Sequence, residues 1–136
     1  MRRGIPGAEE EVAPSVTGGE RVMPPMTESE LLAAVLELAA FAGFRCHHVR
    51  PAWSQRGYRT PLQGDKGFPD LCLCGHKRLL IVELKSEDGE VTPEQWLWIE
   101  ALTLAGIEAY IWRPDDWADG TIAKALGCEG RVVGHR

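Results

Sequence analysis

The stretch that decides the fold runs from Gly67 to Lys85 and reads Gly-Phe-Pro-Asp-Leu-Cys-Leu-Cys-Gly-His-Lys-Arg-Leu-Leu-Ile-Val-Glu-Leu-Lys. It contains two short apolar runs, residues 71–74 and 79–84, separated by the polar residues 75–78. Two apolar runs on either side of a short polar segment are typical of a β-hairpin. We therefore expect the chain to fold around an antiparallel strand pair at this point.

The pairing across this turn predicts which side chains meet, whether the loop has two residues or four. The predicted pairs are Cys74 with Leu79, Cys72 with Ile81, and Asp70 with Glu83. Side chains alternate between faces, so Lys85 lies on the same face as Glu83.

Two opposed like charges destabilise a sheet unless something neutralises them. Carboxylate oxygens suit Mg²⁺ or Mn²⁺, so we expect Asp70 and Glu83 to bind such a cation, with Lys85 beside it. The pattern alone also allows a surface ion pair between Glu83 and Lys85, with Asp70 unrelated to it.

These residues resemble the signature of the PD-(D/E)xK nucleases, and the wider string resembles their virus-type replication-repair nuclease (VRR-NUC) branch. The matching strings are Gly67-Phe68-Pro69-Asp70-Leu71, Glu83-Leu84-Lys85-Ser86, Thr92-Pro93-Glu94-Gln95 and Trp112-Arg113-Pro114. The resemblance covers residues 27–117. It implies a metal-dependent phosphodiesterase that acts on DNA. It also implies that the Leu84 carbonyl is a third metal ligand, and that Lys85 orients the attacking water or stabilises charge on the phosphate.

The first helix begins with a capping box, Thr27-Glu28-Ser29-Glu30, and ends at Gly43. In the resembling family a glutamate from this helix completes the metal site. We choose Glu30 for this role and keep Glu28 in reserve. The alternative is that Glu30 only closes the capping box.

The second helix begins at Thr92-Pro93-Glu94-Gln95, another capping box, and ends at Gly106. We expect Gln95 to contact the site, the alternative being that it only closes the box. The helix is apolar on more than one side, which predicts a homodimer interface, unless its tryptophans fill the monomer core. Its apolar residues are Trp96, Leu97, Trp98, Ile99 and Leu102.

The order of elements is helix, strand, strand, strand, helix, strand, with outer strands at residues 44–49 and 107–112. This order predicts an α/β fold with a mixed four-stranded sheet and flanking helices. The resemblance implies that this is the restriction-endonuclease-like core. Residues 115–126 are expected to form a short helix. We expect a disordered tail over residues 1–26, the nuclease domain over 27–126, and a loose tail over 127–136.

Residues 50–66 form a long connection that leads into Asp70 and is expected to bind DNA, because basic and aromatic side chains alternate in it. The alternative is a solvated loop. Its candidate DNA-binding residues are Arg50, Arg56, Tyr58, Arg59 and Lys66.

The composition places limits on the other functions. The net charge of −5 argues against coating nucleic acid by bulk charge. No apolar run is long enough to span a membrane and no signal peptide is visible, so a cytoplasmic protein with reduced cysteines is expected. Zinc bound by Cys72, Cys74 and neighbouring histidines is a less favoured possibility.

The sequence therefore predicts a Mg²⁺- or Mn²⁺-dependent DNA endonuclease. Members of the resembling family act on branched or flapped DNA, and relatives include Holliday junction resolvases, so we expect branched DNA as the substrate. The alternatives are a DNA-binding module that has the nuclease fold without turnover, and a zinc-binding interaction domain.

Overall fold

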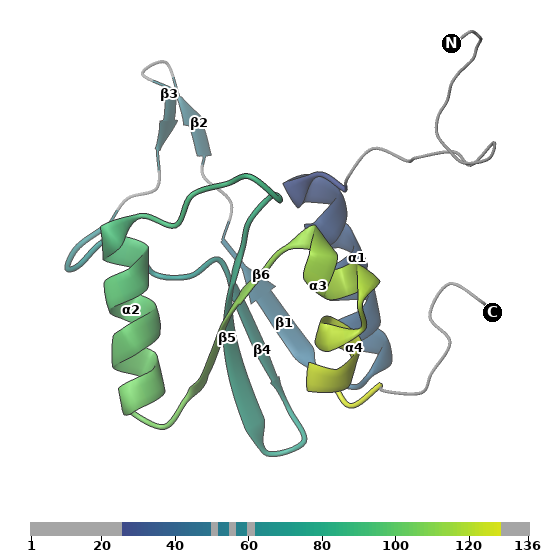
Figure 1. The fold of residues 1–136 in the computed structure, drawn as a ribbon. Coiled ribbons are helices and arrows are strands. Elements are labelled where there is room, and N and C mark those ends of the chain that lie inside the picture. Colours follow the sequence, from purple (N-terminus) through teal and green to yellow (C-terminus); the bar gives the residue numbers. More distant parts are fainter. Residues whose placement is uncertain (1–25, 50–51, 55–56, 60–61, 129–136) are drawn as a thin grey trace, which may run out of the picture.

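The structure, a computed structural model, describes residues 26–49, 52–54, 57–59 and 62–128. A central sheet lies between α2 on one side and α1, α3 and α4 on the other (Figure 1). The helices are α1 (Glu28–Phe41), α2 (Pro93–Leu104), α3 (Pro114–Ala118) and α4 (Thr121–Ala125). The strands are β1 (Arg45–His48), β2 (Ala52–Ser54), β3 (Gly57–Arg59), β4 (Leu71–Gly75), β5 (Arg78–Leu84) and β6 (Glu108–Trp112).

The predicted hairpin is formed by β4 and β5, and its predicted register is confirmed. Cys74 pairs with Leu79 and Cys72 with Ile81. The loop has two residues, His76 and Lys77, with φ of 53° and 64°. Positive φ at both central residues is the geometry of a type I′ turn, whose twist matches that of the flanking strands.

The four-stranded sheet has the order β1-β4-β5-β6. Its first three strands are antiparallel neighbours, and β6 runs parallel to β5 after the crossover through α2. This confirms the predicted α/β fold, a mixed four-stranded sheet with flanking helices.

The hydrophobic core lies on one face of the sheet. Leu80, Val82 and Leu84 of β5 join the buried cluster that includes α1 residues such as Leu31 and Val35. Because side chains alternate along a strand, Ile81 and Glu83 point to the opposite face, where α2 packs. None of the α2 residues is fully buried, so this second layer is thin.

The structure differs from expectation in two segments, the 50–66 connection and the terminal helix. The long connection over residues 50–66 was expected to be a loop, yet it contains a second sheet, the β2–β3 hairpin, with Trp53 opposite Tyr58. The expected terminal helix is divided into α3 and α4, because Gly120 has φ of 88° and interrupts it. Such a φ is unfavourable in a right-handed helix but easy for glycine.

The described part of the chain remains packed up to Cys128. Cys128 is buried, so packing continues two residues past the expected domain end at residue 126. Residues 1–25 and 129–136, where tails were expected, lie outside the described residues, as do Arg50 and Arg56. Across the described segments, no helix has the length and apolarity that crossing a membrane requires.

Candidate active site

Asp70, Glu83 and Lys85 lie at the end of the sheet where β5 finishes. Asp70 directly precedes β4, and its Oδ2 accepts a long hydrogen bond, 3.5 Å, from the backbone N–H of Leu84. Glu83 is the penultimate residue of β5, and the backbone N–H of Lys85 donates to the carbonyl of Trp112 across 3.0 Å. The hairpin and the parallel β6 therefore hold the three side chains at one place.

Glu83 is buried in an unusual environment for a carboxylate. It is 3% exposed, and its Oε1 is buried without a hydrogen-bond partner among the described residues. Its Oε2 lies 3.5 Å from Lys85 Nζ. The pKa of Glu83 is raised from 4.5 to about 7, first by burial and then by the charge of Asp70, while Lys85 lowers it in part. Raised carboxyl pKa values of this kind are common at functional sites.

Gln95 performs both of the roles that the sequence left as alternatives. Its Oε1 accepts from the Thr92 N–H at 2.9 Å and its own N–H donates to Thr92 Oγ1 at 3.1 Å, which closes the capping box of α2. The other end of the same amide, Nε2, donates to Glu83 Oε2 across 3.0 Å. The start of α2 is thereby fixed to the buried carboxylate.

Glu28 and Glu30, the two glutamates considered for the metal site, both lie in the first turn of α1. Glu30 closes the α1 capping box, with Oε1 accepting from the Thr27 N–H at 2.9 Å and Thr27 Oγ1 accepting from the Glu30 N–H at 3.1 Å. This bond engages the carboxylate of Glu30. Glu28 is instead close enough for its charge to contribute to the raised pKa of Glu83. Glu30 therefore closes the capping box, the alternative given for it, and which of the two glutamates serves the metal site stays a prediction.

Arg113 has a role that the sequence did not reveal. Its Nη1 donates to three carbonyls in the turn after β5, those of Ser86 at 2.8 Å, Glu87 at 3.2 Å and Gly89 at 2.7 Å. One cation thus closes the turn that begins directly after Lys85. The sequence offered only its place in a matching string, because the contact joins segments 24 to 27 residues apart.

The predicted DNA-binding residues are only partly described. Arg50 and Arg56 lie outside the described residues, and Tyr58 and Arg59 lie on β3, whose side chains are not described. Lys66 is well exposed and lies 4.0 Å from Glu94 of α2. In Figure 1 the β2–β3 hairpin lies at the end of the molecule where β5 finishes.

The zinc alternative receives no support from the described part of the chain. All four cysteines are free thiols, and no three His, Cys, Asp or Glu side chains converge there as a metal cluster. The pKa of the Cys72 thiol is raised by burial and by Cys74.

A hard divalent cation fits the residues at the end of β5 better. Mg²⁺ is commonly held by one or two carboxylates and keeps several waters, so Asp70 and Glu83 would be enough acidic ligands for such a cation without a third. The unpartnered Glu83 Oε1 and the repulsion from Asp70 are the features that a cation would relieve.

The fold and this group of side chains define a nuclease-type α/β domain. The model of the VRR-NUC domain family matches residues 29–115, so the chain belongs to that family. A solved structure described as a VRR_NUC domain protein matches with a TM-score of 0.54 and 22% identity, over 77% of this chain and 92% of that one. No curated protein matches at a significant level.

Proposed function

We propose that this protein is a metal-dependent DNA endonuclease that hydrolyses phosphodiester bonds. The observation that supports this most strongly is Glu83, a carboxylate 3% exposed, placed against Asp70 with one oxygen unpartnered. An ionised buried carboxylate is costly unless it is paired or coordinates a metal. Membership of the VRR-NUC family supports nuclease activity in general.

In the proposed site, Asp70, Glu83 and the Leu84 carbonyl hold Mg²⁺ or Mn²⁺. The bound cation would polarise the scissile phosphate and lower the pKa of a bound water. Lys85 Nζ, 3.5 Å from Glu83 Oε2, would donate a hydrogen bond to the attacking water or to a phosphate oxygen as charge develops there. Gln95 keeps the Glu83 carboxylate in one orientation through its 3.0 Å hydrogen bond, and Glu28 is the candidate contribution from α1.

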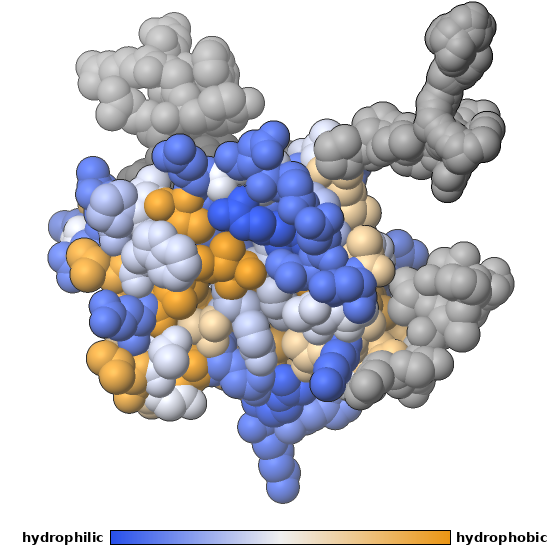
Figure 2. Space-filling model, in the orientation of Figure 1, coloured by the Kyte–Doolittle hydropathy of each residue, from blue (hydrophilic) through white to orange (hydrophobic). Residues whose placement is uncertain are grey.

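Branched DNA is the proposed substrate, as the family resemblance implies. Such junctions have approximate two-fold symmetry, and a C₂ dimer would present two equivalent sites to them. The outer face of α2 supports self-association, because Trp96 is 53% exposed and Leu104 82% exposed. Figure 2 shows hydrophobic residues gathered on the α2 side of the molecule. Large exposed apolar patches are typical of interfaces.

A cleavage panel tests the activity directly. The protein would be incubated with a four-way junction, a flap, a fork, a single strand and a linear duplex, with Mg²⁺, with Mn²⁺ or with EDTA. We expect metal-dependent cutting of branched substrates that Asp70→Ala and Glu83→Ala abolish. Glu37→Ala, an exposed position on α1, is the control and should cut normally. Wild-type rates in either site variant would exclude this assignment.

The contribution of the long connection can be measured separately. Replacing Arg50, Arg56 and Arg59 with Ala should weaken DNA binding and reduce the slope of log K against log salt by roughly 0.9 per lost phosphate contact. The measurement uses an uncleaved substrate without Mg²⁺ or Mn²⁺. An unchanged slope would show that these arginines do not contact DNA.

A further inference from the structure

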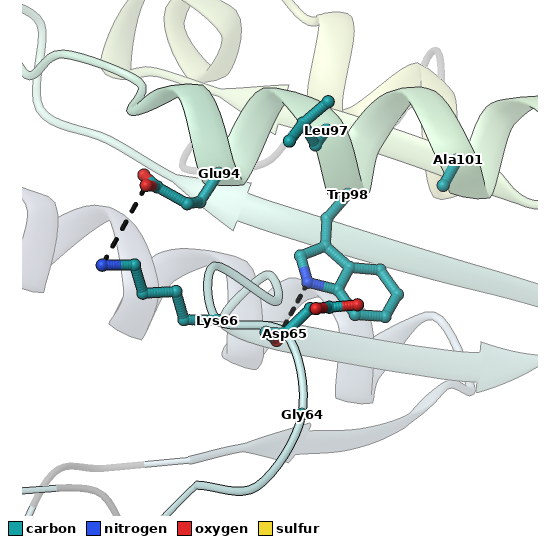
Figure 3. Close-up of a pocket in the computed structure, with 7 residues that line it drawn as sticks. All are labelled: Gly64, Asp65, Lys66, Glu94, Leu97, Trp98 and Ala101. Atoms are coloured by element: carbon teal, nitrogen blue, oxygen red, sulfur yellow. Dashed lines mark hydrogen bonds and ion pairs between the residues drawn. The ribbon is translucent and has the colours of Figure 1, made fainter.

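A hollow of about 550 Å³ lies beside α2, outside the group of catalytic candidates. One wall is the loop before β4, and the other is a face of α2 (Figure 3). Its lining residues are Gly64, Asp65, Lys66, Glu94, Leu97, Trp98 and Ala101. The volume is within the range of small-molecule sites.

Both walls of the hollow are continuous with the proposed active site. The loop wall ends at Lys66, four residues before Asp70, and Glu94 on the helix wall is adjacent to Gln95. Glu94, Trp98 and Ala101 lie about a sixth to a third of a turn around the helix from Gln95, and Trp98 is less than one turn along it. A DNA strand whose phosphate lies at Glu83 would therefore bring a nearby nucleotide to this hollow.

The aromatic part of the hollow is held in place before any ligand binds. Trp98 Nε1 donates to the Asp65 carbonyl across 3.3 Å, and Phe68 packs edge-to-face on the Trp98 ring with centroids 4.9 Å apart. The loop approaches the helix so closely that a Cβ on Gly67 would lie 2.8 Å from the Glu94 backbone. A preorganised aromatic surface loses little entropy when a flat ring stacks on it.

The charges of the hollow select a base rather than a phosphate. Asp65 and Glu94 outnumber Lys66, so a phosphate would be repelled. The Lys66–Glu94 ion pair spans 4.0 Å and its side chains are 72% and 44% exposed, so it is weak and easily displaced. When this ion pair opens, the Glu94 carboxylate oxygens can accept hydrogen bonds from base N–H donors, and the Lys66 ammonium is freed as well.

We propose that this hollow receives an unpaired nucleobase next to the cleaved phosphate, and that Glu94 makes guanine the preferred base. An unpaired guanine presents N1–H and N2–H₂ side by side, which matches the two oxygens of one carboxylate, while the other bases place an acceptor beside their N–H donor. Trp98, Leu97 and Ala101 supply the apolar surface for the ring. This inference rests on the proposed function, and it places the base between α2 and the end of the 50–66 connection, whose residues Gly64, Asp65 and Lys66 line the hollow.

The test is a binding measurement that needs no turnover. Fluorescence anisotropy in Ca²⁺ would compare forks that carry one unpaired G, A, C or T at the branch with a fully paired duplex. We expect about tenfold tighter binding of the G fork, the lower range for a bidentate carboxylate–base contact. Glu94→Gln should abolish the preference for G. Ala101→Phe, a substitution at an exposed position that fills the hollow, should weaken binding of every unpaired base and leave duplex binding unchanged.

The controls separate this inference from the proposed function. Glu37→Gln, at an exposed position on α1, should keep the G preference. A preference for the G fork without cleavage of any DNA would support base binding in the hollow and exclude the proposed nuclease activity. The base-binding proposal would be wrong if the protein cleaves DNA but binds the four forks equally. It would also be wrong if Glu94→Gln and Ala101→Phe bind the forks as the wild type does. In both cases the proposed nuclease activity would be unaffected. A shift of Ala101→Phe to a smaller mass in light scattering would also overturn it, because the hollow would then be a contact between copies.

Discussion

Replacing Glu83 with Gln should stabilise the metal-free protein at alkaline pH. The side chain keeps its shape and can still accept the hydrogen bond from Gln95, but it loses the charge that burial and Asp70 disfavour. A pKa of about 7 in place of 4.5 corresponds to about 3 kcal/mol, at 1.36 kcal/mol per pKa unit. Because Glu83 is 3% exposed, solvent screening reduces this value little.

The sign of the pH dependence follows from the direction of the shift. The folded-state pKa of Glu83 is above its unfolded value, so this group's contribution to stability is complete below pH 4.5 and is lost as the pH rises through about 7. The advantage of Glu83→Gln over wild type should therefore be about 1 kcal/mol at pH 5 and about 3 kcal/mol at pH 8.

Urea unfolding in EDTA at pH 5 and pH 8 measures both values, with Glu37→Gln as the control for loss of an exposed carboxylate. Added Mn²⁺ should stabilise the wild type and not Glu83→Gln, because only the wild type retains both acidic ligands. If Glu83→Gln and wild type change in parallel between pH 5 and pH 8, or if the variant is less stable at pH 8, the electrostatic description of the site is wrong.

Three further changes test other parts of the structure. Lys85→Ala should lose DNA cleavage yet keep Mn²⁺-dependent thermal stabilisation, because Lys85 is not a proposed ligand; retained cleavage would reduce it to a structural partner of Glu83. Gly67→Ala should lower the melting temperature more than Gly64→Ala, since both have φ of +96° but only at Gly67 would the new Cβ meet the Glu94 backbone, at 2.8 Å; equal melting temperatures would contradict the close approach. Trp96→Ser should shift the mass in light scattering from about 30 kDa, twice the 15.0 kDa chain, towards the monomer; a wild type that is monomeric at every micromolar concentration would exclude the dimer.

The features that could be predicted from sequence are those decided by neighbours along the chain. The hairpin register follows from the two apolar runs and a short turn, and both capping boxes follow from a threonine three residues before an acid or amide. These interactions span a few residues, so their geometry hardly depends on the rest of the fold. The Asp119-Gly120 pair is a turn sequence, and it divides α3 from α4. The single helix expected over residues 115–126 did not take this pair into account.

The features that were missed depend on how distant elements meet. The choice between Glu28 and Glu30 depends on how α1 is rotated against the sheet, and the sequence does not specify that rotation. The Arg113 contacts and the hollow under Trp98 join segments 24 to 33 residues apart. The β2–β3 strands have three residues each and carry few apolar side chains, so their hydrophobic pattern is too short to identify.

The capping boxes of α1 and α2 end in a carboxylate and an amide respectively, and this difference restricts which residues can occupy position 95. In α1 the third helical position is Glu30, and in α2 it is Gln95. Either residue closes a capping box equally well, so a helix in isolation would accept both. At Gln95, however, the second end of the side chain must donate to Glu83, and a glutamate there would add another acidic group to a place that already holds Asp70 and Glu83. Variation at residue 95 should therefore be restricted to an uncharged donor, even though the helix itself imposes no such restriction.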